Sequence, residues 1–143
     1  MVLAKRQPLR KIEEINVFNK HKYFPQGLRD YGKLRDRGSS SETTMQNYNN
    51  VWIQEKTGYP NNLLHFNLDK DRIHPTQKPI ALLEYLIQTY TQEGSIVLDN
   101  CMGSGSTAIA SINTNRQWIG MELEQEYVDI ANERIGEHVK NNT

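Results

Sequence analysis

The strongest constraint on the fold is a glycine loop that follows a short apolar strand and leads into a helix. Residues 95–99 read S-I-V-L-D, and the loop N-C-M-G-S-G-S-T comes directly after them. Glycine adopts backbone conformations that other residues avoid, so Gly103 and Gly105 allow a sharp turn into the helix. The first N–H groups of that helix then point at whatever lies beyond the strand. The segment predicts a strand–loop–helix unit with a ligand above the loop, the alternative being a purely structural turn.

Helix and strand patterns alternate around this loop. Apolar residues from Leu82 to Tyr90 recur on one helical face, which predicts a helix that starts near Pro79 and ends before Gly94. We expect a helix over about 104–113, a strand over 118–123, and a last helix that carries Tyr127 and Ile135. Two further strands are expected near 14–19 and over 62–68, with loops and at most short elements over 20–60. This alternation predicts an α/β fold with a mostly parallel sheet, whose ligands bind at the carboxyl ends of the strands.

Charge is distributed unevenly along a chain whose net charge is +0. Residues 1–80 contain 14 Lys and Arg against 8 Asp and Glu, whereas residues 81–143 contain 3 against 9. A basic first part suits a polyanionic partner, because phosphate contacts dominate the affinity of proteins for nucleic acids. Solvated surface charge is an equally good interpretation of the composition alone.

The chain has the size of one ordinary domain, at 143 residues. No apolar run approaches the roughly 18 residues of a membrane-spanning helix, and the first residues lack the apolar core of a signal peptide. The single cysteine, Cys101, closes no internal disulfide and is compatible with a reducing compartment. We therefore expect a soluble cytoplasmic protein with no membrane partner, and the sequence predicts no metal site.

A second acidic residue narrows the kind of ligand. Glu122 ends the strand that follows the loop by about twenty residues, where a carboxylate can accept hydrogen bonds from both ribose hydroxyls. No lysine follows Gly105, which argues against a phosphate-binding P-loop, whereas Ala108 leaves a dinucleotide possible. Asp99 would repel a pyrophosphate and suits a cationic amino group, such as that of the methionine part of S-adenosylmethionine. The pattern favours a nucleoside-type cofactor.

Three segments together resemble a known family. H-P-T-Q-K-P (74–79), V-L-D-N-C-M-G-S-G-S-T (97–107) and I-G-M-E-L (119–123) are similar to the C-terminal half of the beta-group DNA amino-methyltransferases, whose patterns are H-P-[TA]-x-K-P, D-P-F-x-G-S-G-T-T and G-x-E. The segment P-L-R-K-I-E-E-I-N-V-F extends the resemblance upstream to nearly the whole chain. The resemblance implies a partial Rossmann-like S-adenosylmethionine methyltransferase fold with three layers, and methyl transfer to adenine N6 or cytosine N4 in DNA.

The resemblance also assigns residues to the cofactor. It implies that the methionine end lies against the glycine loop, that Glu122 holds the ribose, and that the carboxylate lies near the lysine of the first motif, with His74 and Pro75 as a rigid lead-in. Asn100 and Cys101 replace the family's Pro-Phe, which removes an aromatic contact but not the loop. The candidate cofactor-binding residues are Thr76, Lys78, Asp99, Gly103, Ser104, Gly105 and Glu122.

The catalytic motif of this family is absent from the chain. That motif, [DNS]-P-P-[YFW], holds the amino group of a flipped-out base, and none of the five prolines here is adjacent to another. In the beta-group order the motif lies upstream of the first expected strand. The sequence therefore contains no candidate catalytic residue and resembles a methyltransferase without its N-terminal half.

The resemblance places residues 20–60 at the target-recognition region. Basic residues there are interleaved with aromatic ones, which suits phosphate contacts together with base stacking. The candidate DNA-binding residues are Lys22, Arg29, Lys33, Arg35 and Arg37. A loop exposed by the lack of its partner half is the alternative, and both can hold.

The sequence thus predicts three parts: a strand-containing lead-in (1–19), a loop-rich target-recognition region (20–60) and a cofactor-binding α/β half-domain (61–143). Three hypotheses remain for the function. The chain belongs to an S-adenosylmethionine-dependent DNA methyltransferase, or it is a non-catalytic cofactor- or DNA-binding remnant, or it is one half of a split enzyme that a second chain or self-association completes.

Overall fold

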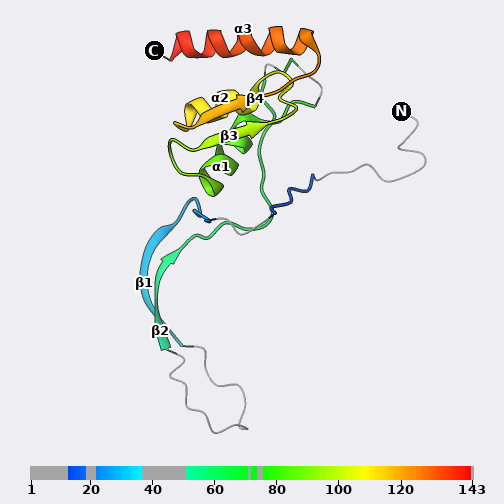
Figure 1. Cartoon of the computed structure of the whole chain (residues 1–143). Helices are drawn as coiled ribbons and strands as arrows, with labels where there is room; N and C mark the ends of the chain where they lie inside the picture. The colour runs from blue at the N-terminus through cyan, green and yellow to red at the C-terminus, as the bar shows by residue number, and fades with distance from the viewer. Residues whose placement is uncertain (1–12, 19–21, 37–50, 71, 74–75, 143) are drawn as a thin grey trace, which may run out of the picture.

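The computed structural model describes residues 13–18, 22–36, 51–70, 72–73 and 76–142. Four strands and three helices lie within these ranges, and Figure 1 shows their arrangement. In chain order they are β1 (Arg29–Asp36), β2 (Val51–Thr57), α1 (Ile80–Tyr90), β3 (Ile96–Asp99), α2 (Ser106–Asn113), β4 (Gln117–Gly120) and α3 (Gln125–Asn141).

The part that follows Pro79 alternates helix and strand as the sequence predicts. β3 and β4 pair in parallel, from Ile96 opposite Gln117 to Asp99 opposite Gly120, and α2 connects them. Met121 continues the ladder by donating its N–H to the Asp99 carbonyl at 2.8 Å. The prediction of a partial Rossmann-like α/β fold with a parallel sheet is confirmed. β4 ends at Gly120, three residues before the apolar pattern does, because the Met121 carbonyl and the Glu122 carboxylate accept hydrogen bonds from the glycine loop.

Small side chains let the helices of this part pack closely. α2 contacts α1, α3 and β4, so it lies at the centre of the packed region. The buried apolar residues come mainly from α2, with one each from α1 and α3: Ile87, Ala108, Ile109, Ala110 and Ala131. This core fixes the end of the glycine loop from which α2 starts.

One face of the β3–β4 sheet carries apolar side chains that are exposed to solvent. Paired residues of adjacent strands lie on the same face, so Leu98 lies beside Ile119. Ile96 lies two residues before Leu98 in β3 and is therefore on the same face. These three side chains are 61%, 48% and 60% exposed, respectively. Parallel sheets are normally covered on both faces, so the described residues leave one face of this sheet uncovered.

A β-hairpin replaces part of the loop region expected over 20–60. β1 and β2 pair antiparallel, from Arg29 opposite Thr57 to Asp36 opposite Val51, with an irregular step between Asp30 and Lys33. Gly32 occupies that step with φ +56°. The expectation of at most short elements was wrong here, because backbone pairing forms strands whose polar sequence lacks apolar alternation. The hairpin projects away from the α/β part (Figure 1).

Two expected strands are not found. Residues 14–18 of the segment 14–19, and all of 62–68, have no strand structure, and Asn19 lies outside the described residues. Apolar alternation indicates a segment that suits a sheet, but a strand also needs a partner for its backbone. Within the described chain, β1 pairs with β2 and β3 pairs with β4, and neither segment joins these sheets.

The segment before the hairpin is fixed to α1. Phe24 donates its N–H to the Thr89 carbonyl at 2.9 Å, and the rings of Tyr23 and Tyr90 lie 6.2 Å apart. Desolvation raises the pKa of the Tyr23 phenol.

No helix in the described part of the chain is long and apolar enough to cross a membrane.

Candidate nucleoside-cofactor site

Asp99 ends β3 and fixes the start of the glycine loop. Its carboxylate accepts a hydrogen bond from the Thr107 hydroxyl at 2.5 Å and from the Cys101 backbone N–H at 3.1 Å. Thr107 lies in the first turn of α2, so one side chain joins the strand end to the helix start. Asn100 and Cys101, which replace the family's Pro-Phe, are both exposed at this turn.

Glu122 lies beside the loop, two residues after the end of β4. Its Oε2 accepts the Gly103 N–H at 2.8 Å, and its Oε1 accepts the N–H groups of Leu123 at 2.8 Å and Glu124 at 3.2 Å. The Met102 N–H also bonds the Met121 carbonyl at 2.9 Å. The structure therefore brings Asp99, Gly103 and Glu122 together at the carboxyl ends of two adjacent parallel strands.

The two glycines of the loop have different surroundings. Gly103 has φ +50°, and a Cβ placed on it would meet no atom within 4 Å. Gly105 has φ +81°, and a Cβ there would lie 3.2 Å from Ala131 Cβ and 3.2 Å from Ile135 Cδ1 of α3. The open side of the loop is thus at Gly103, whereas Gly105 allows α3 to approach.

Ser104, between them, points into the protein. It is 4% exposed, and its hydroxyl donates to Gln77 Oε1 at 3.3 Å. The guanidinium of Arg134, on α3, donates to the Ser104 carbonyl at 3.0 Å. Burial lowers the pKa of Arg134, and the nearby Asp69 opposes that shift. Sequence reasoning missed Gln77 and Arg134, because neither a variable motif position nor an arginine on an amphipathic helix signals a buried contact.

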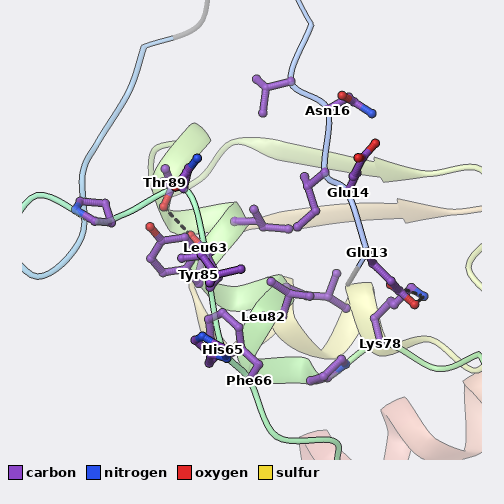
Figure 2. Close-up of a pocket in the computed structure, with 18 of the residues that line it drawn as sticks. Glu13, Glu14, Asn16, Leu63, His65, Phe66, Lys78, Leu82, Tyr85 and Thr89 are labelled. Carbon is purple, nitrogen blue, oxygen red and sulfur yellow. Dashed lines mark hydrogen bonds and ion pairs between the residues drawn. The ribbon is translucent and has the colours of Figure 1, made fainter. Parts of the chain in front are cut away.

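Thr76 and Lys78 line a groove that Asp99, Gly103 and Glu122 do not line. Both are exposed, although Gln77 between them is buried. The Lys78 ammonium pairs with the Glu13 carboxylate at 2.8 Å, as Figure 2 shows. The structure therefore brings together the strand-end residues of the predicted cofactor site but turns Lys78 toward the lead-in segment. His74 and Pro75 lie outside the described residues.

Thr76 and Lys78 line a large groove of about 1210 Å³. Residues 13–17, residues 60–68 and α1 form its walls, and Leu63, Phe66 and Leu82 contribute to its largely apolar lining (Figure 2). The groove exceeds the roughly 300–1,000 Å³ of small-molecule pockets. It lies between segments for which the sequence predicted strands, and Asp99 and Glu122 do not line it.

The hairpin and the segment before it carry the candidate DNA-binding residues. Lys22, Arg29 and Lys33 are exposed, and the Lys33 ammonium lies 5.3 Å from the Tyr31 ring centroid. Arg35 lies in β1, and Arg37 lies outside the described residues. A further cation, Lys56, was not identified from the sequence; it pairs with Asp30 at 2.5 Å across the hairpin. This hydrogen bond and charge lower the pKa of Asp30 and raise that of Lys56.

The arrangement of potential metal ligands does not indicate a metal site in the described ranges. Among those residues, no group of three or more His, Cys, Asp and Glu side chains is arranged to hold a metal ion.

Several proteins with similar sequences or structures are methyltransferases. Residues 2–133 match the family model described as DNA methylase. The type II methyltransferase M.BglII of Bacillus subtilis is 44% identical over 77 residues, which cover 53% of this chain and 21% of that protein. The type II methyltransferase M.HpaI of Haemophilus parainfluenzae is 35% identical over 126 residues, covering 86% and 38%. The crystal structure of an M1.HpyAVI–SAM complex aligns with a TM-score of 0.46 and 31% identity, covering 59% of this chain and 52% of that one.

The matched region is only part of these relatives, because it spans 21% to 38% of the two curated methyltransferases. The family model, in contrast, covers nearly all of this chain, including the lead-in, the hairpin and the glycine loop. The chain therefore belongs to the DNA methylase family of amino-methyltransferases.

Proposed function

We propose that this chain holds S-adenosylmethionine for methyl transfer to an exocyclic amino group of DNA, at adenine N6 or cytosine N4. The observation that carries this proposal is the 2.8 Å hydrogen bond between the Gly103 N–H and the Glu122 carboxylate. It joins a loop with open space above Gly103 to an acidic strand end, at the edge of a parallel sheet where α/β proteins bind nucleotides.

Each strand-end residue has a separate part in this binding. Glu122 is oriented by three backbone N–H groups and accepts hydrogen bonds from the ribose hydroxyls. Asp99 offers negative charge to the cationic end of the cofactor. The missing side chain of Gly103 lets the cofactor approach the backbone.

In this proposal, Lys78 binds the cofactor carboxylate in place of its present partner, the Glu13 carboxylate. Its ion pair with Glu13 is exposed on both sides, with side-chain exposures of 46% and 74%. Such pairs contribute about 0–1 kcal/mol, so a ligand carboxylate competes with Glu13 at little cost. Thr76 adds a neighbouring hydroxyl donor.

Isothermal titration calorimetry with S-adenosylmethionine tests this site. We expect Glu122→Gln to weaken binding by roughly 1.5–3 kcal/mol, the range for hydrogen bonds to a charged group. Glu124→Gln is the matched control, because it removes the same charge from an exposed side chain that lies two residues further along the chain. Equal affinity of Glu122→Gln and the wild type would contradict the assignment of the ribose site.

Methyl transfer itself needs a group that these 143 residues do not supply. The amino nitrogen attacks the sulfonium methyl group, the C–S bond breaks, and the nitrogen loses a proton. The nitrogen must therefore be held in line at about 3–3.5 Å, which in this family is the work of the proline-proline-aromatic motif. We propose that a complementary segment with this motif covers the sheet face of Ile96, Leu98 and Ile119. The open face, and relatives longer than the matched region, support this proposal.

A reconstitution assay separates a split enzyme from a binding module. The chain is mixed with the part of M.HpaI that the match does not cover, and transfer of labelled methyl groups to duplex DNA is measured. We expect background transfer from either part alone and activity from the mixture. The substitution Leu98→Glu on the open sheet face should abolish the activity of the mixture. Cofactor binding without restored transfer would favour the non-catalytic alternative.

The hairpin and its flanking residues are proposed as the DNA contact, through Lys22, Arg29, Lys33, Arg35 and Arg37. Exposed cations beside an aromatic ring, as for Lys33 and Tyr31, support phosphate and base contacts. In a salt titration of duplex binding, Arg29→Gln with Lys33→Gln should reduce the slope of log K against log salt by about 2. Lys140→Gln, at the far end of α3, should leave the slope unchanged.

A further inference from the structure

A chain of buried and partly buried hydrogen bonds joins the segment before α1 to the glycine loop. Gln77 is 7% exposed and Ser104 is 4% exposed. Gln77 Oε1 accepts the Ser104 hydroxyl at 3.3 Å and the Ile73 N–H at 3.2 Å, while its Nε2 donates to Asp69 at 3.3 Å. Asp69 also accepts the N–H of Ile80, the first residue of α1, at 3.3 Å. One glutamine thus connects α1, its lead-in and the loop.

Arg134 continues the connection from α3. Its Nη1 donates to the Ser104 carbonyl at 3.0 Å, to the Ser106 hydroxyl at 2.9 Å and to the Ser104 hydroxyl at 3.4 Å. Hydrogen bonds from a charged donor are about twice as strong as neutral ones. The loop is therefore held from the α3 side by a guanidinium and from the α1 side by an amide.

The residues joined in this way alternate with the candidate cofactor-binding residues. Gln77 lies between Thr76 and Lys78, which are exposed, and Ser104 lies between Gly103 and Gly105. Hydrogen bonds are directional, so this connection fixes the register of the two segments, whereas apolar contacts would permit sliding. A shift of one segment would move Thr76 and Lys78 relative to Gly103.

We infer that Gln77, Ser104 and Arg134 are positioning residues, which hold the Thr76–Lys78 segment and the glycine loop in the mutual geometry that the cofactor requires. This inference rests on the proposed cofactor site and adds residues that need not touch the cofactor. The three side chains act as one unit, because Ser104 is bonded to both of the others.

Two variants of the full chain remove the connection at different points. Gln77→Met keeps the length of the side chain without its amide, and Ser104→Ala removes only a hydroxyl. Each should weaken S-adenosylmethionine binding roughly three- to tenfold in calorimetry, the scale of one or two buried hydrogen bonds. The double variant should lose much less than the product of the two, because contacting residues are not additive. Gln92→Ala, an exposed glutamine after α1, is the control and should bind as the wild type does.

Amide hydrogen exchange tests the same connection without any ligand. In Gln77→Met, exchange should become faster at Ile73, whose N–H bonds Gln77, and at Gly103 to Gly105, while the centres of α1 and α3 keep their protection. If the wild type fails to bind the cofactor, the proposed function is wrong, and the exchange experiment still decides the connection. Unchanged exchange at Ile73 and Gly103, a uniform rise across α1 and α3, or fully multiplicative effects of the two substitutions would overturn the inference.

Discussion

The substitution Gly105→Ala measures how closely α3 approaches the glycine loop. The new Cβ would lie 3.2 Å from both Ala131 Cβ and Ile135 Cδ1, and the backbone φ is +81°. The left-handed conformation costs a residue with a Cβ about 1–2 kcal/mol. Crowding in a packed region adds roughly 1–3 kcal/mol. The smaller conformational freedom of unfolded alanine offsets about 0.4–1 kcal/mol of this sum.

A matched variant separates the two costs. Gly94 has nearly the same φ, +77°, but a Cβ on it would meet no atom within 4 Å. Gly94→Ala therefore carries the conformational cost alone. We expect Gly105→Ala to lower the free energy of unfolding by about 1–3 kcal/mol more than Gly94→Ala does.

Urea unfolding followed by circular dichroism gives the comparison, provided that the slope with urea is the same for both variants. Ile135→Val removes Cδ1, one of the two crowded atoms, so it should reduce the extra cost of Gly105→Ala. If Gly105→Ala and Gly94→Ala agree within about 0.5 kcal/mol, the close approach of α3 is wrong.

Three further predictions concern other parts of the chain. Leu98→Glu, at a side chain that is 61% exposed, should leave the thermal midpoint of the isolated chain nearly unchanged and should reduce self-association in sedimentation; a large loss of stability would mean that this sheet face is covered. Lys56→Gln should raise the pKa of Asp30 in an NMR titration toward its ordinary 3.8, because the hydrogen bond and charge of Lys56 lower that pKa. The pKa of Asp30 is lower in the folded state, so the pair's contribution to stability is present above pH 3.8 and is lost as the pH falls through the folded pKa. An unchanged pKa of Asp30 in the variant would exclude the pair. The purified chain alone should transfer no labelled methyl group to DNA at saturating cofactor, and activity that Asp99→Ala abolishes would show that the proline-proline-aromatic motif is dispensable.

Local patterns predicted the elements that are close together along the chain. The glycines after S-I-V-L-D, the helical spacing of apolar residues and Glu122 at a strand end predicted β3, α2, β4 and their shared edge. These features depend on contacts within about twenty residues and on the rule that parallel strands end at the same edge. The strands expected at 14–19 and 62–68 were wrong because strand formation depends on a pairing edge, which apolar alternation does not provide.

The sequence by itself determined that Asp99, Gly103 and Glu122 meet, since two adjacent parallel strands and one loop leave no other arrangement. Only the tertiary structure decided that Gly103 faces open space and Gly105 faces α3, and that Ser104 joins Gln77 and Arg134. It also turned Lys78 toward Glu13, 65 positions away in the sequence. The physical reason is the range of the contacts: Ser104 bonds residues 27 and 30 positions away, and such partners are set by how helices pack and not by the spacing of residues along one element.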